Sequence, residues 1–254
     1  MKLEGSSAIV TGAGSGLGAA TAAALAAKRV KVIGIDLPAA VVRETSFAPA
    51  GVHLVAANVT DEDEVLAALA QLDAAHPLRL VVNCAGIAPA RRILSSKGTH
   101  DLASFRAAIE INLIGTFNVM RLAAEAMSKN EPVDDFEQRG LIVNTASVAA
   151  YEGQIGQIAY SASKGGVVAM TITAARDLAL HGIRVNTIAP GIMDTPMLAA
   201  LGPEVNASLA ASVTFPRRLG IAEEYAQLVL MLADHDYLNG ETFRMDGGIR
   251  MSPR

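Results

Sequence analysis

The feature that most constrains the fold is a regular alternation of short, β-branched apolar runs with longer segments of helical character. Seven runs are predicted as strands: Ser7–Thr11, Lys31–Ile35, Val52–Ala57, Leu80–Asn83, Leu141–Ala146, Ile183–Ile188 and Thr242–Met245. Because helical segments separate these strands, consecutive strands are expected to lie parallel and to be joined by right-handed crossovers. The sequence therefore predicts one doubly wound α/β domain over residues 1–254, with about seven parallel strands and helices on both faces.

The segments between the strands differ in character. Helices are expected over Leu17–Lys28, Asp61–Ala75, Leu102–Ser128 and Ala222–Ala233, and from the region of Tyr160 to about His181, where Gly182 ends the helix. Thr60 and Asp63 form a capping signal for the second of these helices. Pro38–Ala50 predicts at most a short helix, Arg91–Asp101 and Glu131–Gln138 predict polar loops, and Ile192–Phe215 predicts a mobile helical lid with an apolar underside.

Composition excludes several classes of function. Apolar residues make up 51% of the chain and charged residues 18%; the net charge of −4 without a basic block argues against nucleic acid or an anionic membrane as partner. The single cysteine excludes a disulfide framework, and the five scattered histidines form no metal-binding pattern, so no metal is expected. The absence of a signal-type segment and of an apolar run of ~18 residues predicts a soluble cytoplasmic protein.

A glycine-rich turn lies between the first strand and the first helix. Its spacing is Thr11-Gly12-x-x-x-Gly16-x-Gly18; the strict G-x-G-x-x-G pattern fails because Leu17 stands where the third glycine would be, and no P-loop pattern is present. A strand, a glycine turn and a helix in this order can present free backbone N–H groups to a pyrophosphate, as in Rossmann-type sites. Taken alone, the turn is equally compatible with a plain tight turn.

An acidic residue follows the second predicted strand. Asp36 lies about twenty residues beyond the glycines, where a carboxylate can bind the adenosine ribose hydroxyls. Leu37 and Pro38 follow it, so no arginine stands beside it to offset the repulsion of a 2′-phosphate. A solvated carboxylate is the alternative for Asp36 alone, but together with the glycine turn it predicts a site for NAD.

A serine, a tyrosine and a lysine are spaced for proton transfer to a substrate oxygen. Tyr160 and Lys164 are four residues apart and so lie one turn apart on the same face of a helix. A free phenol has a pKa of roughly 10, and a nearby ammonium is expected to lower that pKa. Ser147, after the predicted strand Leu141–Ala146, can hydrogen-bond the reacting oxygen. A chance surface pair is the alternative for tyrosine and lysine taken alone.

Several motifs together resemble one enzyme family. They are Thr11-Gly12-x-x-x-Gly16-x-Gly18, Asn83-Cys84-Ala85-Gly86, Asn112, Ser147, Tyr160-x-x-x-Lys164 and Pro190-Gly191. The chain is similar to the short-chain dehydrogenases/reductases over essentially its whole length. The resemblance implies hydride transfer between a nicotinamide and a carbonyl or alcohol carbon, with Tyr160 as the acid–base and Ser147 orienting the substrate oxygen. It further implies that Lys164 lowers the tyrosine pKa and holds the nicotinamide ribose, and that Asn112 maintains a proton relay.

The resemblance also implies which residues contact the ligands. The implied NAD site comprises Thr11, Gly12, Ser15, Gly16, Leu17, Gly18, Asp36, Leu37, Asn58, Val59, Asn83, Cys84, Ala85, Gly86, Tyr160, Lys164, Pro190, Gly191, Ile192, Thr195 and Met197. The implied substrate site comprises Ser147, Gln154, Gln157 and Tyr160. Two departures are noted: Asn58 replaces an aspartate usual beside the adenine, and Asp194 adds an acid at the lid entrance. The family is typically tetrameric, so a homotetramer is expected.

Within the family, the runs NCAGIA, KGTHDLASF, INLIGTFNVMRLAAEAM, NTASVAAYEGQIGQIAYSASKGG, AARDLA, GIRVNTIAPG and NGETFRMDGGIRM are most similar to 3-hydroxyacyl-CoA dehydrogenases. This similarity implies NAD-dependent interconversion of a 3-hydroxyacyl-CoA and a 3-oxoacyl-CoA. Two alternatives remain open: a dehydrogenase of another alcohol, such as a hydroxysteroid or an acyl-carrier-protein thioester, and a non-catalytic dinucleotide-binding scaffold. The scaffold predicts a broken Ser/Tyr/Lys set, whereas all three residues are present.

Overall fold

The computed structural model describes residues 1–44, 49–199 and 202–253. Its centre is a seven-stranded sheet in the order β11-β8-β7-β4-β1-β2-β3, and every neighbouring pair in it is parallel. The strands are β1 (Ser7–Thr11), β2 (Lys31–Asp36), β3 (Val52–Ala56), β4 (Leu78–Asn83), β7 (Gly140–Thr145), β8 (Ile183–Pro190) and β11 (Thr242–Met245). The predicted doubly wound α/β fold with seven parallel strands is confirmed.

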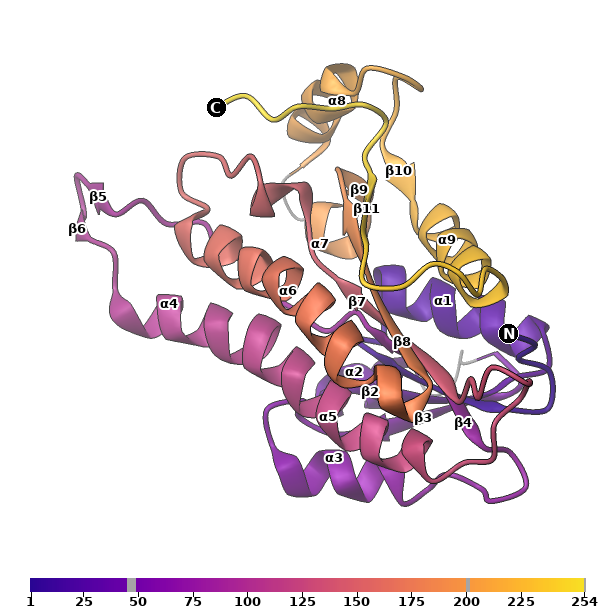
Figure 1. Cartoon of the computed structure of the whole chain (residues 1–254). Helices are drawn as coiled ribbons and strands as arrows, with labels where there is room; N and C mark the ends of the chain where they lie inside the picture. The colour runs from indigo at the N-terminus through magenta and orange to yellow at the C-terminus, as the bar shows by residue number, and fades with distance from the viewer. Residues whose placement is uncertain (45–48, 200–201, 254) are drawn as a thin grey trace.

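Helices cover both faces of the sheet (Figure 1). One face packs against α1 (Gly16–Ala27) and α9 (Ala222–Asp234), with Leu25 and Leu232 among the buried contacts. The other face packs against α3 (Glu62–Leu69), α5 (Gly115–Ser128) and α6 (Ile158–Asp177), with Val65 and Val119 in that core. The central strands β1, β4 and β7 are buried along their whole length, which explains their continuous apolar runs.

The second predicted helix begins and ends differently from expectation. The capping residue of α3 is Asp61, whose carboxylate accepts from the Glu64 N–H at 3.0 Å, and not Thr60, whose hydroxyl donates to Asn58. The helix ends at Leu69 instead of Ala75. The Asp73 carboxylate accepts from the Ala75 N–H at 2.9 Å, a local bond that competes with helix continuation.

Two segments predicted as uniform contain further structure. The Arg91–Asp101 loop is a small hairpin of β5 (Leu94–Ser95) and β6 (Gly98–Thr99), which projects beyond the N-terminal end of α6 in Figure 1. The predicted Leu102–Ser128 helix consists of α4 (Leu102–Ile109), a π-helical turn over Glu110–Ile114 and α5. Such turns occur mainly at functional sites, and this one contains Asn112.

The remaining connections follow the predictions closely. The short α2 covers Pro38–Glu44, while residues 45–48 of the predicted Pro38–Ala50 segment lie outside the described residues. After α6, a 3₁₀ turn over Ala179–His181 ends at Gly182, whose φ of +65° is the left-handed conformation expected at a helix end.

The predicted lid is only partly helical. Its described part contains β9 (Met193–Asp194), α7 (Pro196–Ala199) and α8 (Pro203–Ser212), and β9 pairs with β10 (Gly220–Ile221). Residues 200–201, including Leu201 of the expected apolar underside, lie outside the described residues. Met193 is buried, but Met197 and Phe215 are 56% and 80% exposed, so the predicted apolar underside does not form a closed surface over residues 192–215 as far as they are described.

Candidate active site

The predicted site residues gather at the carboxyl edge of the sheet. β1 is flanked by β4 on one side and by β2 on the other, so the chain connections diverge at this point of the strand order. In open α/β sheets ligands bind in the crevice at such a switch point. The Thr11 hydroxyl oxygen accepts from the N–H groups of Cys84 and Ala85 at 3.1 and 3.0 Å, which fixes the ends of the two strands to each other.

The glycine turn is built for close approach of backbone to backbone. Gly12 has φ +66°, and a Cβ there would lie 2.9 Å from the Ala85 nitrogen. A Cβ on Gly18 would overlap the Gly12 carbonyl oxygen. These contacts explain why glycine stands at position 18 while Leu17, which is half-buried, is tolerated next to it. Ser15 is exposed at the N-terminus of α1, where free N–H groups face outward.

Asp36 closes the other side of this turn. Its carboxylate accepts from the Gly14 N–H and from the Leu37 N–H, both at 2.8 Å. Gly14 is a residue that sequence reasoning missed, although it lies within the recognised glycine turn: a Cβ there would lie 2.9 Å from the Asp36 carboxylate. The two hydrogen bonds leave lone pairs on both carboxylate oxygens for ribose hydroxyls.

The Asn58-Val59 pair is fixed by its own contacts. The Asn58 side-chain oxygen accepts from the Thr60 N–H and hydroxyl at 3.1 and 3.0 Å. Val59 is buried and lies against Gly115, where a Cβ would clash with the valine side chain. The segment is therefore held in one conformation at the end of β3, next to Asp36, which pairs with Ala56 in the sheet.

Cys84 belongs to a small buried polar cluster. Its sulfur lies 3.6 Å from the Thr145 hydroxyl and 3.7 Å from the Tyr225 hydroxyl, and these two hydroxyls are 2.7 Å apart. Burial raises the pKa of the Cys84 thiol, which keeps it protonated. The neighbouring Asn83 donates from its side chain to Asn144 at 2.9 Å across the sheet. The Cys84 thiol is thus held in place by its neighbours and is not activated as a nucleophile.

Tyr160, Lys164 and Ser147 lie together as expected. Ser147 follows β7, and its hydroxyl interacts with the Tyr160 side chain, which acts to lower the pKa of that phenol. The Lys164 ammonium lies 5.8 Å from the centre of the tyrosine ring and donates to the Thr145 carbonyl at 2.7 Å. Lys164 is only 4% exposed, so this carbonyl fixes its position at the bottom of the site.

The lowering of the Tyr160 pKa by Lys164 stays a prediction for the protein with its ligands bound. Burial raises the pKa of Tyr160, and the Ser147 hydrogen bond offsets only part of that rise. Burial also lowers the pKa of Lys164 from 10.5 to about 8. Burial is the largest cause of both pKa shifts, because both charged forms lose hydration in the low-dielectric surroundings of the site.

Asn112 connects the π-helical turn to the site. Its side-chain oxygen accepts from the Ile87 N–H at 2.8 Å, and its amide donates to the Ile87 carbonyl and to the Ser163 hydroxyl, both at 2.9 Å. A Cβ on Gly86 would lie 3.0 Å from the Asn112 oxygen and 3.6 Å from the Lys164 ammonium, so glycine is needed there. Ser163, which sequence reasoning missed, lies inside the recognised Tyr160–Lys164 motif.

The residues after β8 lie next to the glycine turn. The Gly191 N–H donates to the Met245 carbonyl at 2.9 Å, and a Cβ on Gly191 would lie 2.8 Å from Asp246. Thr195 lies against Gly16, because a Cβ on Gly16 would be 3.5 Å from the threonine side chain. Pro190 and Ile192 flank Gly191, and the Met197 side chain is 56% exposed.

The two predicted substrate glutamines lie in one loop beside α6. The Gln157 side-chain oxygen accepts from the Gln154 N–H at 3.0 Å, and the Gln154 amide donates to the Ser252 carbonyl at 3.2 Å. Neither side chain is fully exposed. Both glutamines therefore have protein partners in the structure without a substrate.

Two further findings concern the described part of the chain. Over residues 1–44, 49–199 and 202–253, no group of three or more His, Cys, Asp or Glu side chains is placed to hold a metal ion. Over the same ranges, no helix is long and apolar enough to cross a membrane.

The chain is similar to known proteins over essentially its whole length. Residues 6–206 match the family described as short chain dehydrogenase. The chain is 49% identical to the 3-hydroxyacyl-CoA dehydrogenase type-2 of Rattus norvegicus, covering 99% of this chain and 97% of the relative. It is 51% identical to the Drosophila melanogaster protein of the same name, covering 96% and 97%. A crystal structure of 3-hydroxyacyl-CoA dehydrogenase type-2 from Mycobacterium avium superposes with a TM-score of 0.92 at 43% identity, covering 100% and 99%.

These matches agree with the geometry at the carboxyl edge of the sheet. The similarity extends over essentially the complete length of the relatives, and the serine, the tyrosine and the lysine lie at the carboxyl edge of the sheet, where the switch point is. The family implies a nicotinamide dinucleotide cofactor, and the glycine turn and Asp36 fit such a group because the N-terminus of α1 and the Asp36 carboxylate lie on either side of the turn. The chain is a member of the short-chain dehydrogenase family, an oxidoreductase with a nicotinamide dinucleotide cofactor.

Proposed function

We propose that this protein is an NAD-dependent 3-hydroxyacyl-CoA dehydrogenase, interconverting a 3-hydroxyacyl-CoA and a 3-oxoacyl-CoA. The observation that carries the proposal is the placement of the buried Ser147 hydroxyl and the buried Lys164 ammonium beside the Tyr160 side chain. A non-catalytic scaffold has no need of this costly arrangement, because burying an ammonium without a function only destabilises the fold. The thioester substrate is supported by full-length relatives that carry this activity in their names.

The proposed chemistry is proton transfer by Tyr160. In the reducing direction its phenol donates a proton to the substrate carbonyl oxygen, and in the oxidising direction its phenolate accepts the proton of the alcohol. The Ser147 hydroxyl, already paired with Tyr160, orients that oxygen. The bound nicotinamide supplies or accepts the hydride. The acid–base chemistry is thereby separated from the redox chemistry, and the protein provides only the former.

Lys164 and Asn112 support the tyrosine. With a pKa of about 8, Lys164 is mostly protonated at neutral pH and stabilises the phenolate as it forms. We assign it the nicotinamide ribose hydroxyls as a second partner. The Asn112 amide donates to the Ser163 hydroxyl, which donates to the Tyr160 carbonyl, and we assign these groups the role of proton relay.

The cofactor residues divide by position. We assign the pyrophosphate to the turn Gly12–Gly18 with Ser15 and Leu17, the adenosine to Asp36, Leu37, Asn58 and Val59, and the nicotinamide half to Asn83–Gly86, Tyr160, Lys164, Pro190–Ile192, Thr195 and Met197. Asn58 supports this assignment through its side-chain amide nitrogen, since its side-chain oxygen accepts from Thr60, its N–H donates to Glu64 and its carbonyl accepts from the Asp61 N–H. The carboxylate of Asp36 supports NAD as the coenzyme.

The substrate is tested by measuring NADH oxidation with a panel of 3-oxoacyl-CoA thioesters, ketosteroids and 3-oxoacyl-acyl-carrier-protein substrates. We expect the CoA thioesters to give the highest kcat/KM. Preference for a ketosteroid or a carrier-protein thioester would leave a short-chain dehydrogenase with another substrate. Absence of turnover with every member of the panel would contradict the proposal.

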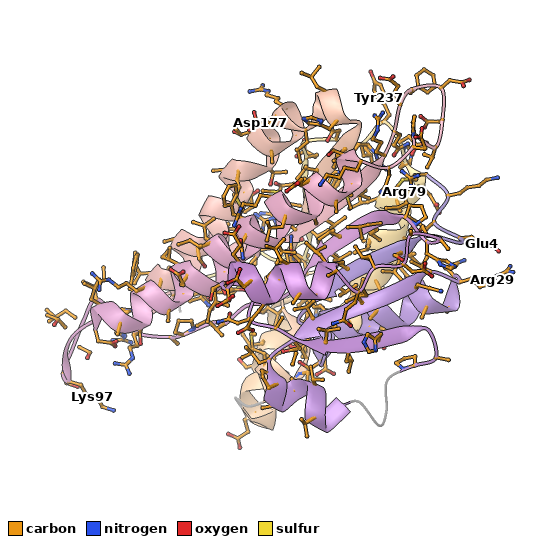
Figure 2. The ribbon with its side chains drawn as sticks, turned by 90° about the horizontal axis from the view of Figure 1, so that it is seen from below. Glu4, Arg29, Arg79, Lys97, Asp177 and Tyr237 are labelled. Carbon is orange, nitrogen blue, oxygen red and sulfur yellow. The ribbon has the colours of Figure 1, made fainter. Side chains whose placement is uncertain are left out.

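A variant comparison tests recognition of the CoA end. The cationic residues of the β5–β6 hairpin favour a phosphate-bearing substrate, but Arg91 is paired with Asp101 at 2.6 Å and is unsuitable for the test. Lys97 lies at the tip of the hairpin (Figure 2), and Arg92 is exposed. The double variant Arg92→Ala/Lys97→Ala should raise KM for a short 3-oxoacyl-CoA at low salt by up to about thirtyfold, at most ~1 kcal/mol per contact.

The controls make the comparison specific. The same acyl group on a short uncharged thioester should be almost unaffected by Arg92→Ala/Lys97→Ala. The variant Lys2→Ala/Lys28→Ala changes the net charge equally at exposed positions outside the proposed site and should leave both KM values unchanged. An equal response of the two thioesters would show that the hairpin does not recognise CoA.

A homotetramer is part of the proposal. One face of α6 carries the small residues Ala162, Gly165 and Ala169, and a Cβ on Gly165 would meet open space. Ile172 on the same helix and Phe117 on α5 are 43% and 49% exposed. Such a face suits close packing against a second copy. Sedimentation equilibrium should give four times the 26.3 kDa chain mass, and a monomer at micromolar concentration would contradict the homotetramer.

The lid over residues 192–215 and the cytoplasmic location stay predictions.

A further inference from the structure

The loop that carries the two substrate glutamines is held by residues outside it. This loop, residues 151–157, joins the 3₁₀ turn Val148–Ala150 to α6. The Ile155 N–H donates to the Pro253 carbonyl at 3.1 Å, and the Gly156 carbonyl accepts from the Arg91 N–H at 2.8 Å. In Figure 1 the C-terminal segment runs over this loop. The 151–157 loop therefore depends on two distant segments for its backbone position.

An arginine at the end of β11 is the centre of these contacts. Arg244 donates from both terminal nitrogens to the Glu152 carboxylate, at 2.9 and 3.3 Å. Its third nitrogen, Nε, donates to Asp246 at 2.8 Å, and Nη2 also donates to the Ile249 carbonyl at 3.2 Å. Its guanidinium lies 5.5 Å from the centre of the Tyr151 ring. Arg244 thus binds the loop through two neighbouring residues at once.

The same network reaches the cofactor side of the site. Asp246, the partner of Arg244, lies against Gly191, where a Cβ would come within 2.8 Å of it. Glu152 also accepts from the Met251 N–H at 3.0 Å, which attaches the C-terminal segment to the loop. Arg244 therefore fixes the position of the loop after β7 relative to the loop after β8. These are the two loops that carry Ser147 and Pro190-Gly191.

The ion pair is stronger than an ordinary surface pair. Its side chains are 24% and 22% exposed, and the contact is bidentate, which fixes the direction of both groups. The Arg244 hydrogen bonds hold the pKa of the Glu152 carboxyl below its usual value, so the carboxylate is charged at neutral pH. A lysine cannot reproduce the fork of an arginine at such a site.

We propose that Arg244 and Glu152 are positioning residues that hold the 151–157 loop in its substrate-binding conformation and so determine KM for the acyl substrate. This inference rests on the proposed function, because the loop contributes Gln154 and Gln157 to the substrate site. Neither residue touches the reacting atoms in this assignment. Their effect is on where the loop lies, and a displacement of about 1 Å in such a loop can cost about 100-fold in catalytic efficiency.

The test uses Arg244→Met, which removes the charge but keeps an extended side chain, and Arg244→Lys, which keeps the charge without the bidentate contact. Arg29→Met is the matched control, because Arg29 pairs with Glu4 at 3.0 Å at the opposite end of the molecule from Lys97 (Figure 2). Two readouts are measured in parallel: hydrogen exchange of the peptide covering residues 151–157, and KM and kcat for a 3-oxoacyl-CoA at saturating NADH.

Arg244→Met should raise KM by roughly 10- to 100-fold with a smaller change in kcat, and should increase hydrogen exchange in residues 151–157. Arg244→Lys should give an intermediate result, and Arg29→Met should match the wild type. Unchanged exchange in the loop, or an unchanged KM for the 3-oxoacyl-CoA, would overturn the proposal. If Arg244→Met does not fold, Glu152→Gln, which keeps the shape of the partner, is measured in its place.

The two readouts separate this inference from the proposed function. If the wild-type protein does not reduce 3-oxoacyl-CoA, the proposed substrate is wrong, while hydrogen exchange still shows whether Arg244 holds the loop. If the wild type reduces the thioester and the exchange of the loop is insensitive to Arg244, the function stands and the positioning role fails.

Discussion

Replacing Tyr160 by phenylalanine should lower kcat for 3-oxoacyl-CoA reduction by about 10²- to 10⁴-fold, the usual contribution of general acid–base catalysis. The substitution removes one hydroxyl and keeps the ring, so the packing around α6 and the cation beside the ring are preserved. Because the Tyr160 hydroxyl pairs with Ser147, its loss leaves the serine to orient the substrate without a proton donor. The change is expected in kcat, measured by NADH oxidation at saturating substrate.

The matched control is Tyr237→Phe. Tyr237 is 98% exposed and lies at the periphery of the molecule (Figure 2), so loss of its hydroxyl should leave kcat unchanged. Circular dichroism and the dissociation constant of NADH should be the same for both variants and the wild type. Turnover of Tyr160→Phe close to that of the wild type would assign the proton to another group.

The second large effect concerns the coenzyme. Wild-type kcat/KM should be higher with NADH than with NADPH by about three orders of magnitude, because a carboxylate and a phosphate charge about 4 Å apart repel by roughly 4 kcal/mol at an effective dielectric of 20. The carboxylate cannot easily turn away, since Gly14 and Leu37 hold both of its oxygens. Asp36→Asn removes the charge and keeps one acceptor. It should lower the ratio of kcat/KM with NADH to kcat/KM with NADPH by at least tenfold.

An exposed acid outside the site provides the control. Asp135 lies in the loop over residues 131–138, and Asp135→Asn removes the same charge without contact with the glycine turn. It should leave the coenzyme ratio unchanged. Comparable kcat/KM for NADH and NADPH in the wild type would contradict the role given to Asp36. If Asp135→Asn changed the NADH-to-NADPH ratio of kcat/KM as much as Asp36→Asn does, the preference for NADH would be a general effect of net charge.

The sequence predicted the architecture because the signals for it are local. A strand buried on both faces requires a continuous apolar run, and the seven runs are confirmed as the seven strands of the sheet. Parallel pairing then brings the carboxyl ends of all these strands to one edge, so the order of Thr11, Asp36, Asn83 and Ser147 along the chain already implied a shared crevice.

Local rules failed where neighbouring residues compete. Thr60 and Asp61 both suit the capping position of α3, and only the contacts of Asn58 with Thr60 decided in favour of Asp61. The hairpin at residues 94–99 and the π-helical turn at residues 110–114 have no strong sequence signal. In the turn, the side chain of Asn112 is held by Ile87 and Ser163, which are distant along the chain.

The tertiary structure alone decided the electrostatics and the support of the site. The spacing of Tyr160 and Lys164 predicts mutual attraction of their charged forms, but the depth of burial determines both pKa values, and burial is a property of the whole fold. The pairing of Glu152 with Arg244 joins residues 92 positions apart. The amino-acid sequence determines which residues the site contains and their order along the chain. The distances between these residues and their dielectric surroundings arise only when remote segments pack together.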